Sequence, residues 1–293
     1  MPSSENRSVL VYDVGGSHVS AAVCHAGDYR LGAVASAPHP AEATSEAFVA
    51  LLHALGTQAN PGAESILGAG VAMPGPFDYA AGVSWMQHKL PYLYGVDLRA
   101  ALSARFGWQP EQIRFLNDAA AYLLGEVGAG AARGFSRSVA ITLGTGIGCA
   151  FAVDGRVATE GKGVPPGGEI WNLPYEGKTV EDFLSTRAIQ QSYRDRTGQS
   201  SEVSAIAAAA AAGDAVSREV FAGFGRTLGR ALRHLLAEFA PQVVVLGGGI
   251  SRSSGLFVPF ALPELAGLAI ELRTTELGHR APLAGAGLAW FSA

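Results

Sequence analysis

The chain has 293 residues, of which 48% are hydrophobic and 16% are charged, and its formal net charge is −4. This composition is typical of a globular protein and excludes a disordered chain, and the length allows two domains. The acidic balance argues against a large nonspecific contact with nucleic acid, which needs a basic surface. We therefore expect a small-molecule partner and no nucleic acid.

The sequence shows no targeting, membrane or metal signal. Residues 1–7 are polar and lack the apolar core of a signal peptide, and the low-complexity run 205–212 is too short to cross a bilayer. We therefore expect a cytoplasmic protein that does not contact membranes. Cys24 and Cys149 lie in β-like runs, where the ordinary role is that of a small buried hydrophobe. The seven histidines include no pair at ligand spacing within a helix.

The first part of the chain predicts a β-hairpin and then a helix. Residues 9–14 and 19–24 are apolar and β-branched on either side of the Gly15-Gly16 turn. Apolar residues recur at helical spacing over 48–55, which predicts a helix with one buried face. A further apolar strand over 67–72 follows this helix.

Two polar residues stand where the next predicted strand ends. A short helix is expected after Asp97, which suits an N-cap, and residues 113–116 form an apolar strand. This strand delivers Asn117 and Asp118 to its C-terminal end, where a helix over 119–127 begins.

The second part of the chain repeats the layout of the first. Residues 139–148 form another strand, glycine turn and strand, which indicates an internal duplication and two related lobes. Residues 162–177 are rich in Gly and Pro and are expected to form an ordered loop. The remaining predicted elements are a helix from Thr179 with Asp182 in a capping box, an alanine-rich helix, a long helix over 214–239, a strand at 243–249 and a closing helix at 281–291. The pattern is that of an α/β protein.

Three glycine turns, each at the end of an apolar β-like run, indicate a phosphate clamp. A turn without Cβ atoms allows backbone N–H groups to approach anionic oxygens closely. Asp13, beside the first turn, can hold a divalent cation directly or through water. The three turns predict ATP as the ligand, and they lie in the segments 9–17, 139–148 and 243–249.

Two other nucleotide motifs fail in this sequence. A Walker A loop is excluded because Gly161-Lys162 is followed by Gly163. The run 144–149 lacks the third Rossmann glycine, and a strand over 149–153 follows where that fold needs a helix. The observed order of strand, glycine hairpin and strand is similar to the phosphate loops of the actin, Hsp70 and sugar-kinase superfamily.

Over its whole length the chain resembles the ROK family (repressors, open reading frames and kinases), whose enzymes are mostly sugar kinases. The matching motifs are Asp13-Val-Gly-Gly-Ser17, Pro74-Gly-Pro76 with Gly82-Val83, Asn117-Asp118, Leu143-Gly-Thr-Gly-Ile-Gly148, Gly168-Glu-Ile170, Gly247-Gly-Gly249 and Gly285-Ala-Gly287. The resemblance implies a two-lobed actin-like ATPase (ribonuclease H-like) α/β fold with a cleft between the lobes. It implies a smaller lobe of residues 1–117 with 279–293, a larger lobe of residues 118–278, and a homodimer.

The resemblance also implies roles for single residues. Asp118 is expected to be the catalytic base, and Asp13 is expected to hold Mg²⁺, through its water shell. The residues expected to bind the sugar are Asn117, Asp118, Glu169, Asn172, Pro74 and Gly75. The residues expected to bind ATP are Asp13, Gly15, Gly16, Ser17, Gly144, Thr145, Gly146, Gly247, Gly248 and Gly249.

The chain departs from the family's pattern in three places. The family's cysteine cluster is absent, Asn172 replaces a histidine, and His18 stands where a lysine is common. We therefore expect no structural zinc, and a loop around Glu169 that is ordered by other means. The candidates are Pro165, Pro166 and Pro174, and the packing of Trp171, Tyr175 and Phe183 beneath the loop. We also expect no room for the N-terminal DNA-binding module of the family's repressors.

Several alternatives stay open at the level of sequence. Asp118 could be only an N-cap, Glu169 could only brace its loop, and Lys89 could contact a sugar or be a solvated surface charge. The leading function is ATP-dependent phosphorylation of a hexose, by default glucose, at a primary hydroxyl. The alternatives are a polyphosphate-dependent sugar kinase and a sugar-binding sensor or regulator without turnover.

Overall fold

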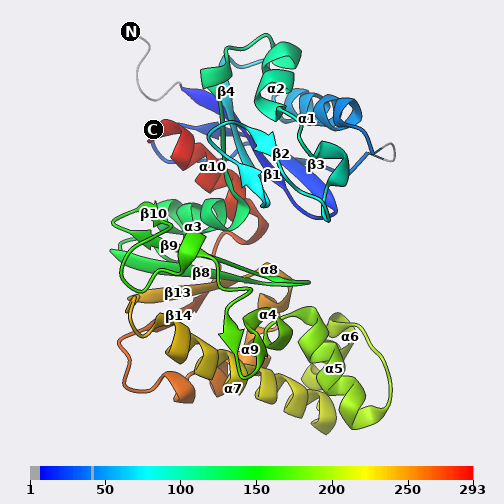
Figure 1. Cartoon of the computed structure of the whole chain (residues 1–293), viewed down its shortest axis with the longest axis vertical. Coiled ribbons are helices and arrows are strands. Elements are labelled where there is room, and N and C mark those ends of the chain that lie inside the picture. The colour runs from blue at the N-terminus through cyan, green and yellow to red at the C-terminus, as the bar shows by residue number, and fades with distance from the viewer. Residues whose placement is uncertain (1–6, 41–42, 293) are drawn as a thin grey trace. The chain divides into compact units, whose positions relative to one another are not determined.

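A computed structural model describes residues 7–40 and 43–292 of the chain (Figure 1). The chain divides into two compact units, one of residues 1–133 with 279–293 and the other of residues 134–278. Helix α3 (Asp118–Ala129) therefore belongs to the first unit, whereas the larger lobe that the resemblance implies begins at residue 118. Within the described residues, none of the helices combines the length and apolar character needed to span a membrane.

The first unit is built on a five-stranded sheet in the order β3-β2-β1-β4-β7. β2 runs antiparallel to β1 and β3, and β4 and β7 continue the sheet parallel to β1. The five strands are β1 (Ser8–Val14), β2 (His18–His25), β3 (Ala35–Pro38), β4 (Ile66–Met73) and β7 (Ile113–Asn117). A separate small hairpin is formed by β5 (Phe77–Asp78) and β6 (Val83–Ser84). The predicted hairpin around Gly15-Gly16 is confirmed.

Helices cover both faces of this sheet (Figure 1). Leu10 and Tyr12 of β1 share one buried cluster with residues of α1 (Ser45–Ala59) and α2 (Leu98–Phe106). Val11 points to the opposite face, where α10 (Ala281–Phe291) packs against β1 and β4. Because side chains alternate along a strand, Asp13 lies on the same face as Val11.

Helices α3 and α10 pack against each other at very short distance. A Cβ atom at Gly125 of α3 would overlap the carbonyl oxygen of Ala281, and one at Gly285 of α10 would overlap that of Ala121. The helix axes can approach this closely only because these positions lack side chains. This packing explains why α3 belongs to the same unit as the C-terminal helix.

The second unit has a sheet of the same connectivity, in the order β10-β9-β8-β13-β14. As in the first unit, the two strands joined by the glycine turn, β8 and β9, are antiparallel. β13 then pairs parallel to β8, and β14 pairs parallel to β13. The strands are β8 (Arg137–Leu143), β9 (Ile147–Val153), β10 (Arg156–Ala158), β13 (Val243–Gly247) and β14 (Glu271–Thr274). The internal duplication and the α/β class predicted from the sequence are confirmed.

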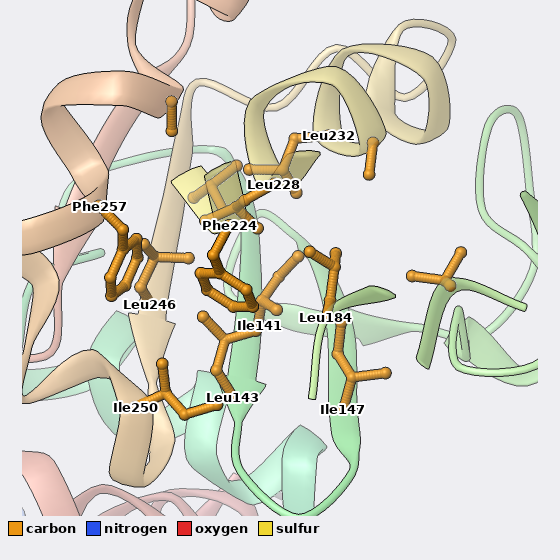
Figure 2. Packing of buried hydrophobic residues seen from close by; sticks show 14 of the residues in the cluster. Ile141, Leu143, Ile147, Leu184, Phe224, Leu228, Leu232, Leu246, Ile250 and Phe257 are labelled. Atoms are coloured by element: carbon orange, nitrogen blue, oxygen red, sulfur yellow. The ribbon is translucent and has the colours of Figure 1, made fainter. Parts of the chain in front are cut away.

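Figure 1 shows α5, α6, α7 and α9 gathered on one side of the second sheet. Ile141 and Leu143 of β8 and Leu246 of β13 contact Phe224, Leu228 and other side chains of α7 and α9 in one buried cluster (Figure 2). The helices are α4 (Val180–Phe183), α5 (Thr186–Thr197), α6 (Val203–Ala211), α7 (Ala215–Leu236), α8 (Gly248–Ser251) and α9 (Ser254–Ala261). The loop after β10 contains the short pair β11 (Pro174–Tyr175) and β12 (Lys178–Thr179).

Candidate active site

The first glycine turn joins β1 to β2 and is held by His39. The backbone N–H of Gly15 donates to the carbonyl of His18 at 2.9 Å, and Nε2 of His39 donates to the carbonyl of Gly15 at 2.8 Å. The backbone N–H of His39 also donates to the carbonyl of Ser17, at 3.2 Å. Gly16 has open space beside its Cα, and Ser17 is exposed. His39 therefore fixes the turn through the carbonyl groups of Gly15 and Ser17, and the space beside Gly16 stays open.

Asp13 is the next-to-last residue of the first strand, and the structure describes no partner for its carboxylate. It is half-buried, and its side chain forms no hydrogen bond or ion pair with the described residues. Burial, and to a smaller extent the negative charge of Asp118, together raise the pKa of Asp13 to about 7. A bound divalent cation would compensate both effects, so this carboxylate fits the predicted Mg²⁺. No group of three or more His, Cys, Asp or Glu side chains in the described ranges is arranged to hold a metal.

Asn117, and not Asp118, caps helix α3. The Oδ1 atom of Asn117 accepts a hydrogen bond from the backbone N–H of Ala120 at 3.1 Å. Asp118 is the first helical residue, and its Oδ1 accepts from the backbone N–H of Ala119 at 2.9 Å. The interpretation of Asp118 as the N-cap is therefore wrong, because the residue before it has the extended backbone that capping needs.

The C-terminal ends of three parallel strands place Asp13, Pro74 and Asn117 along one edge of the first sheet. Asp13 pairs with Ala72 of β4, and Asn117 pairs with Met73, the residue before Pro74. Ligands of open α/β sheets bind at such carboxyl ends.

Tyr79 joins two of these strand ends. Its hydroxyl donates to the carbonyl of Met73 at 3.2 Å and accepts from Nδ2 of Asn117 at 3.1 Å. A Cβ atom at Gly75 would lie 3.6 Å from the same hydroxyl. The structure thus connects the Pro74-Gly75 segment with Asn117 through a residue that no sequence motif had indicated.

The second glycine turn joins β8 to β9 and is held by a hydrogen bond to Glu181. The backbone N–H of Gly144 donates to the carbonyl of Gly146 at 3.0 Å, and the carboxylate of Glu181 accepts from the N–H of Ile147 at 3.1 Å. The carbonyl of Gly144 accepts from the N–H of Thr186 at 2.8 Å. Thr145, between the two glycines, is exposed.

The third glycine turn lies directly against the second. Gly248 has a left-handed backbone with φ +78°, and a Cβ atom there would overlap the backbone of Leu143. Gly247 pairs with Thr142 at the end of the sheet, and Gly249 has open space beside it. Gly248 therefore allows a contact that brings the predicted phosphate and adenosine turns of this unit together.

The loop that carries Glu169 presents two neighbouring side chains to solvent. Ile170 is buried, so Glu169 and Trp171 on either side of it are exposed, Trp171 by 44%. The indole Nε1 of Trp171 donates to Oε2 of Glu169 at 2.8 Å. The predicted packing of Trp171 beneath the loop is therefore wrong. Asn172 is also exposed.

Aromatic packing elsewhere in this loop follows the prediction. Tyr175 is buried, and its ring meets that of Phe183 edge to face with centroids 5.4 Å apart. The capping box of Thr179 and Asp182 is present, and the hydrogen bonds from Thr179 hold the pKa of Asp182 below its usual value. Glu181, in the same short helix, donates its backbone N–H to the carbonyl of Trp171 at 3.1 Å. Glu181 thus links the Glu169 loop to the second glycine turn.

These glycine turns and polar residues are matched by a known family. Residues 9–292 match the model described as ROK family. The chain belongs to the ROK family. A glucokinase of Thermotoga maritima is 29% identical to this ROK protein over 229 residues, which are 68% of this chain and 71% of that protein.

Solved structures agree with this assignment. A ROK hexokinase from Thermus thermophilus matches with a TM-score of 0.81 and 27% identity, over 97% of this chain and 98% of that one. A ROK family glucokinase from Streptomyces griseus, solved in complex with glucose and AMPPNP, matches with a TM-score of 0.78 and 21% identity, over 98% of this chain and 100% of that one. The predicted family, enzyme class and fold, a ROK sugar kinase of the actin-like ATPase fold, are confirmed.

Proposed function

We propose that this ROK protein transfers a phosphoryl group from ATP to the primary hydroxyl of a hexose, with glucose as the first candidate. The related Thermotoga maritima protein is named a glucokinase, and the Streptomyces griseus structure holds glucose and AMPPNP. In this proposal the ligands are held by residues at the strand ends of the first sheet, in the three glycine turns and in the loop that carries Glu169.

The observation that carries the proposal is that Asn117 caps helix α3 while Asp118 occupies its first turn. The Asn117 cap does not require an acid at position 118, where the positive end of the helix dipole favours a negative charge. In this proposal Asp118 accepts the proton of the attacking sugar hydroxyl. A base positioned in this way contributes a factor of about 10²–10⁴ to the rate.

The phosphates of ATP would be held by backbone N–H groups and hydroxyls of the first two glycine turns. The open space beside Gly16 of the first turn fits a phosphate that approaches the backbone closely, and the open space beside Gly249 of the third turn leaves room for another part of the nucleotide. Mg²⁺, when bound, neutralises charge on the transferred phosphoryl group. The Asp13 carboxylate would hold the metal's water shell. The proposed ATP-binding residues are Gly15, Gly16, Ser17, Gly144, Thr145, Gly146, Gly247, Gly248 and Gly249.

The sugar would be bound by Asn117 and the Pro74-Gly75 segment of the first unit and by Glu169 and Asn172 of the second. Asn117 already uses Oδ1 toward Ala120 and one Nδ2 proton toward Tyr79. Its remaining amide proton and oxygen lone pair are what it can offer a sugar hydroxyl. Tyr79 would keep that amide in a fixed orientation.

A coupled ADP-release assay over a panel of hexoses and N-acetylhexosamines tests the proposal, with ATP and with polyphosphate as donors. We expect Asp118→Asn to bind glucose within a few-fold of wild type and to lower kcat by about 10² or more. The matched control is Asp97→Asn, because Asp97 caps α2 and should be replaceable by another good capping residue. Near wild-type turnover of Asp118→Asn would remove Asp118 from the mechanism.

We also propose a homodimer, which the family resemblance implies. Light scattering coupled to size-exclusion chromatography measures the mass in solution, and a mass of about 30.2 kDa at assay concentration would contradict it.

A further inference from the structure

We propose that Trp171 is a positioning residue that holds the Glu169 carboxylate in the orientation in which it binds sugar. This inference rests on the proposed sugar-binding role of Glu169. The two residues lie on either side of buried Ile170, and Nε1 of Trp171 donates to Oε2 of Glu169 at 2.8 Å.

The polarity of this hydrogen bond is fixed by the chemistry of its partners. An indole N–H can only donate, and an ionised carboxylate can only accept. Hydrogen bonds to a charged acceptor are stronger than those between neutral groups. Within the described residues, the Glu169 carboxylate makes no other hydrogen bond, so Oε1 and the remaining lone pair of Oε2 are available to a ligand. Trp171 thus holds Oε2 of Glu169 in place, and Oε1 remains available to bind a sugar hydroxyl.

The backbone beneath Trp171 is itself fixed. The carbonyl of Trp171 accepts from the N–H of Glu181 at 3.1 Å, and the N–H of Leu173 donates to the carbonyl of Ile170 at 3.2 Å. The N–H of Val180 donates to the carbonyl of Leu173 at 3.0 Å, which closes the loop onto helix α4. The fixed backbone of Trp171 determines where its indole lies, and the indole then orients the Glu169 carboxylate through their hydrogen bond.

The exposure of Trp171 argues against a purely structural role. A tryptophan that stabilises a core buries its ring, whereas Trp171 is 44% exposed and uses the polar edge of its indole on a neighbouring side chain. An exposed glutamate otherwise samples several rotamers, and ordering it during binding costs free energy. If the side chain is already ordered in the free protein, binding does not have to order it, and the affinity for sugar is higher by about 2- to 10-fold for one flexible side chain.

The test compares Trp171→Phe with the wild-type chain. Phenylalanine keeps a flat aromatic ring and removes the N–H group, so the Glu169 side chain loses its anchor. We expect the glucose Kd from calorimetry, measured without nucleotide, and the glucose KM to rise about 2- to 10-fold. We expect kcat, the KM for ATP and Tm to stay near wild type, which a loss of structure would not leave unchanged. Trp108→Phe is the matched control, because Trp108 belongs to the first unit and stacks there on Phe106 with ring centroids 4.4 Å apart.

A double-mutant cycle with Glu169→Ala tests the positioning role of Trp171 separately from the sugar-binding role of Glu169. If Trp171 acts through Glu169, then Trp171→Phe has little further effect on glucose Kd once Glu169 is alanine. If Glu169→Ala weakens glucose binding but Trp171→Phe leaves it unchanged, or the two effects simply add, the positioning role is wrong and the sugar-binding role of Glu169 stands. If Glu169→Ala itself leaves glucose binding unchanged, both the proposed role of Glu169 and the positioning role fail.

Discussion

The Glu181 carboxylate accepts a hydrogen bond from the backbone N–H of Ile147 at 3.1 Å, directly after the second glycine turn. A side chain on Gly146 would collide with the same carboxylate. The glycines of this turn have no side chains that could hold it by packing. The half-buried Glu181 therefore holds the turn through a hydrogen bond to its backbone. The same residue donates its backbone N–H to Trp171, so it also supports the Glu169 loop.

Glu181→Ala should loosen the second glycine turn, because it leaves the Ile147 N–H without its acceptor. We expect a loss of about 1–2 kcal/mol in the free energy of unfolding, measured by urea denaturation. We also expect faster hydrogen exchange at the Ile147 amide. Glu181→Gln, which keeps an acceptor oxygen, should lose less, and Glu160→Ala, at an exposed position, should match wild type. Unchanged exchange at Ile147 in Glu181→Ala would show that the turn does not depend on this bond.

Asp13→Asn should make the protein more stable at neutral pH while impairing its use of Mg²⁺ and ATP. Burial and the charge of Asp118 raise the Asp13 pKa from 3.8 to about 7, so between these values the folded state binds a proton that the unfolded state has lost. Stability of the wild type should therefore fall as pH rises from about 4 to about 7 and change no further on this account above that range.

The measurement for Asp13→Asn is Tm as a function of pH without Mg²⁺, because a bound cation would favour the charged carboxylate. The difference in Tm between the variant and the wild type should grow from pH 4 to pH 7 and then level off. Asp28→Asn, an exposed position in the same unit, serves as control. A difference that is constant across this pH range would mean that the Asp13 carboxyl is not perturbed by burial.

His39→Phe should weaken nucleotide use without affecting sugar binding. The phenyl ring can keep the stacking on Phe48, whose ring centroid lies 6.1 Å from that of His39, but it cannot donate to the Gly15 carbonyl. We expect the KM for ATP to rise about 2- to 10-fold, the effect of one lost hydrogen bond, while glucose Kd stays near wild type. His53→Phe is the control, since His53 of α1 contacts the ring of Phe106 of α2, with ring centroids 5.0 Å apart, rather than the glycine turn. An ATP KM equal to that of wild type would assign His39 to packing alone.

The parts of the fold that the sequence predicted well are those with local apolar and turn patterns. The apolar, β-branched runs at 9–14 and 19–24 and the glycine turn between them appear in the structure as an antiparallel hairpin. The helix after Asp97 and the helix over 281–291 also lie where capping and apolar patterns placed them. These signals are local, so they do not depend on knowing which strands become neighbours.

The details that the sequence could not predict depend on distant contacts or on single backbone angles. His39 reaches Gly15 because β3 lies beside β2, and Tyr79 reaches Asn117 across two strand ends. Whether Asn117 or Asp118 caps α3 is decided by the backbone of one residue, and both types are good caps. Aromatic rings usually pack inside a protein, which favours an inward Trp171, but an irregular loop has no period that distinguishes inward positions from outward ones.

The close approach of α3 and α10 gives a prediction that does not depend on ligands. Gly285 lies inside α10, where alanine is favoured over glycine by about 0.5–1 kcal/mol in helix propensity. A Cβ atom there would overlap the carbonyl oxygen of Ala121, and the nearest atoms are backbone, which cannot rotate away. We therefore expect Gly285→Ala to lower the free energy of unfolding by about 1–3 kcal/mol, because overpacking outweighs the gain in propensity.

Gly223→Ala supplies the matched comparison for Gly285→Ala. Gly223 is also inside a long helix, α7, but nothing lies within 4 Å of the position that its Cβ would take. There the propensity gain should act alone and stabilise the protein by up to about 1 kcal/mol. Urea denaturation of the two variants beside wild type should therefore give changes of opposite sign. A Gly285→Ala protein at least as stable as wild type would mean that α3 and α10 can separate without cost, and that Gly285 is not required for their packing.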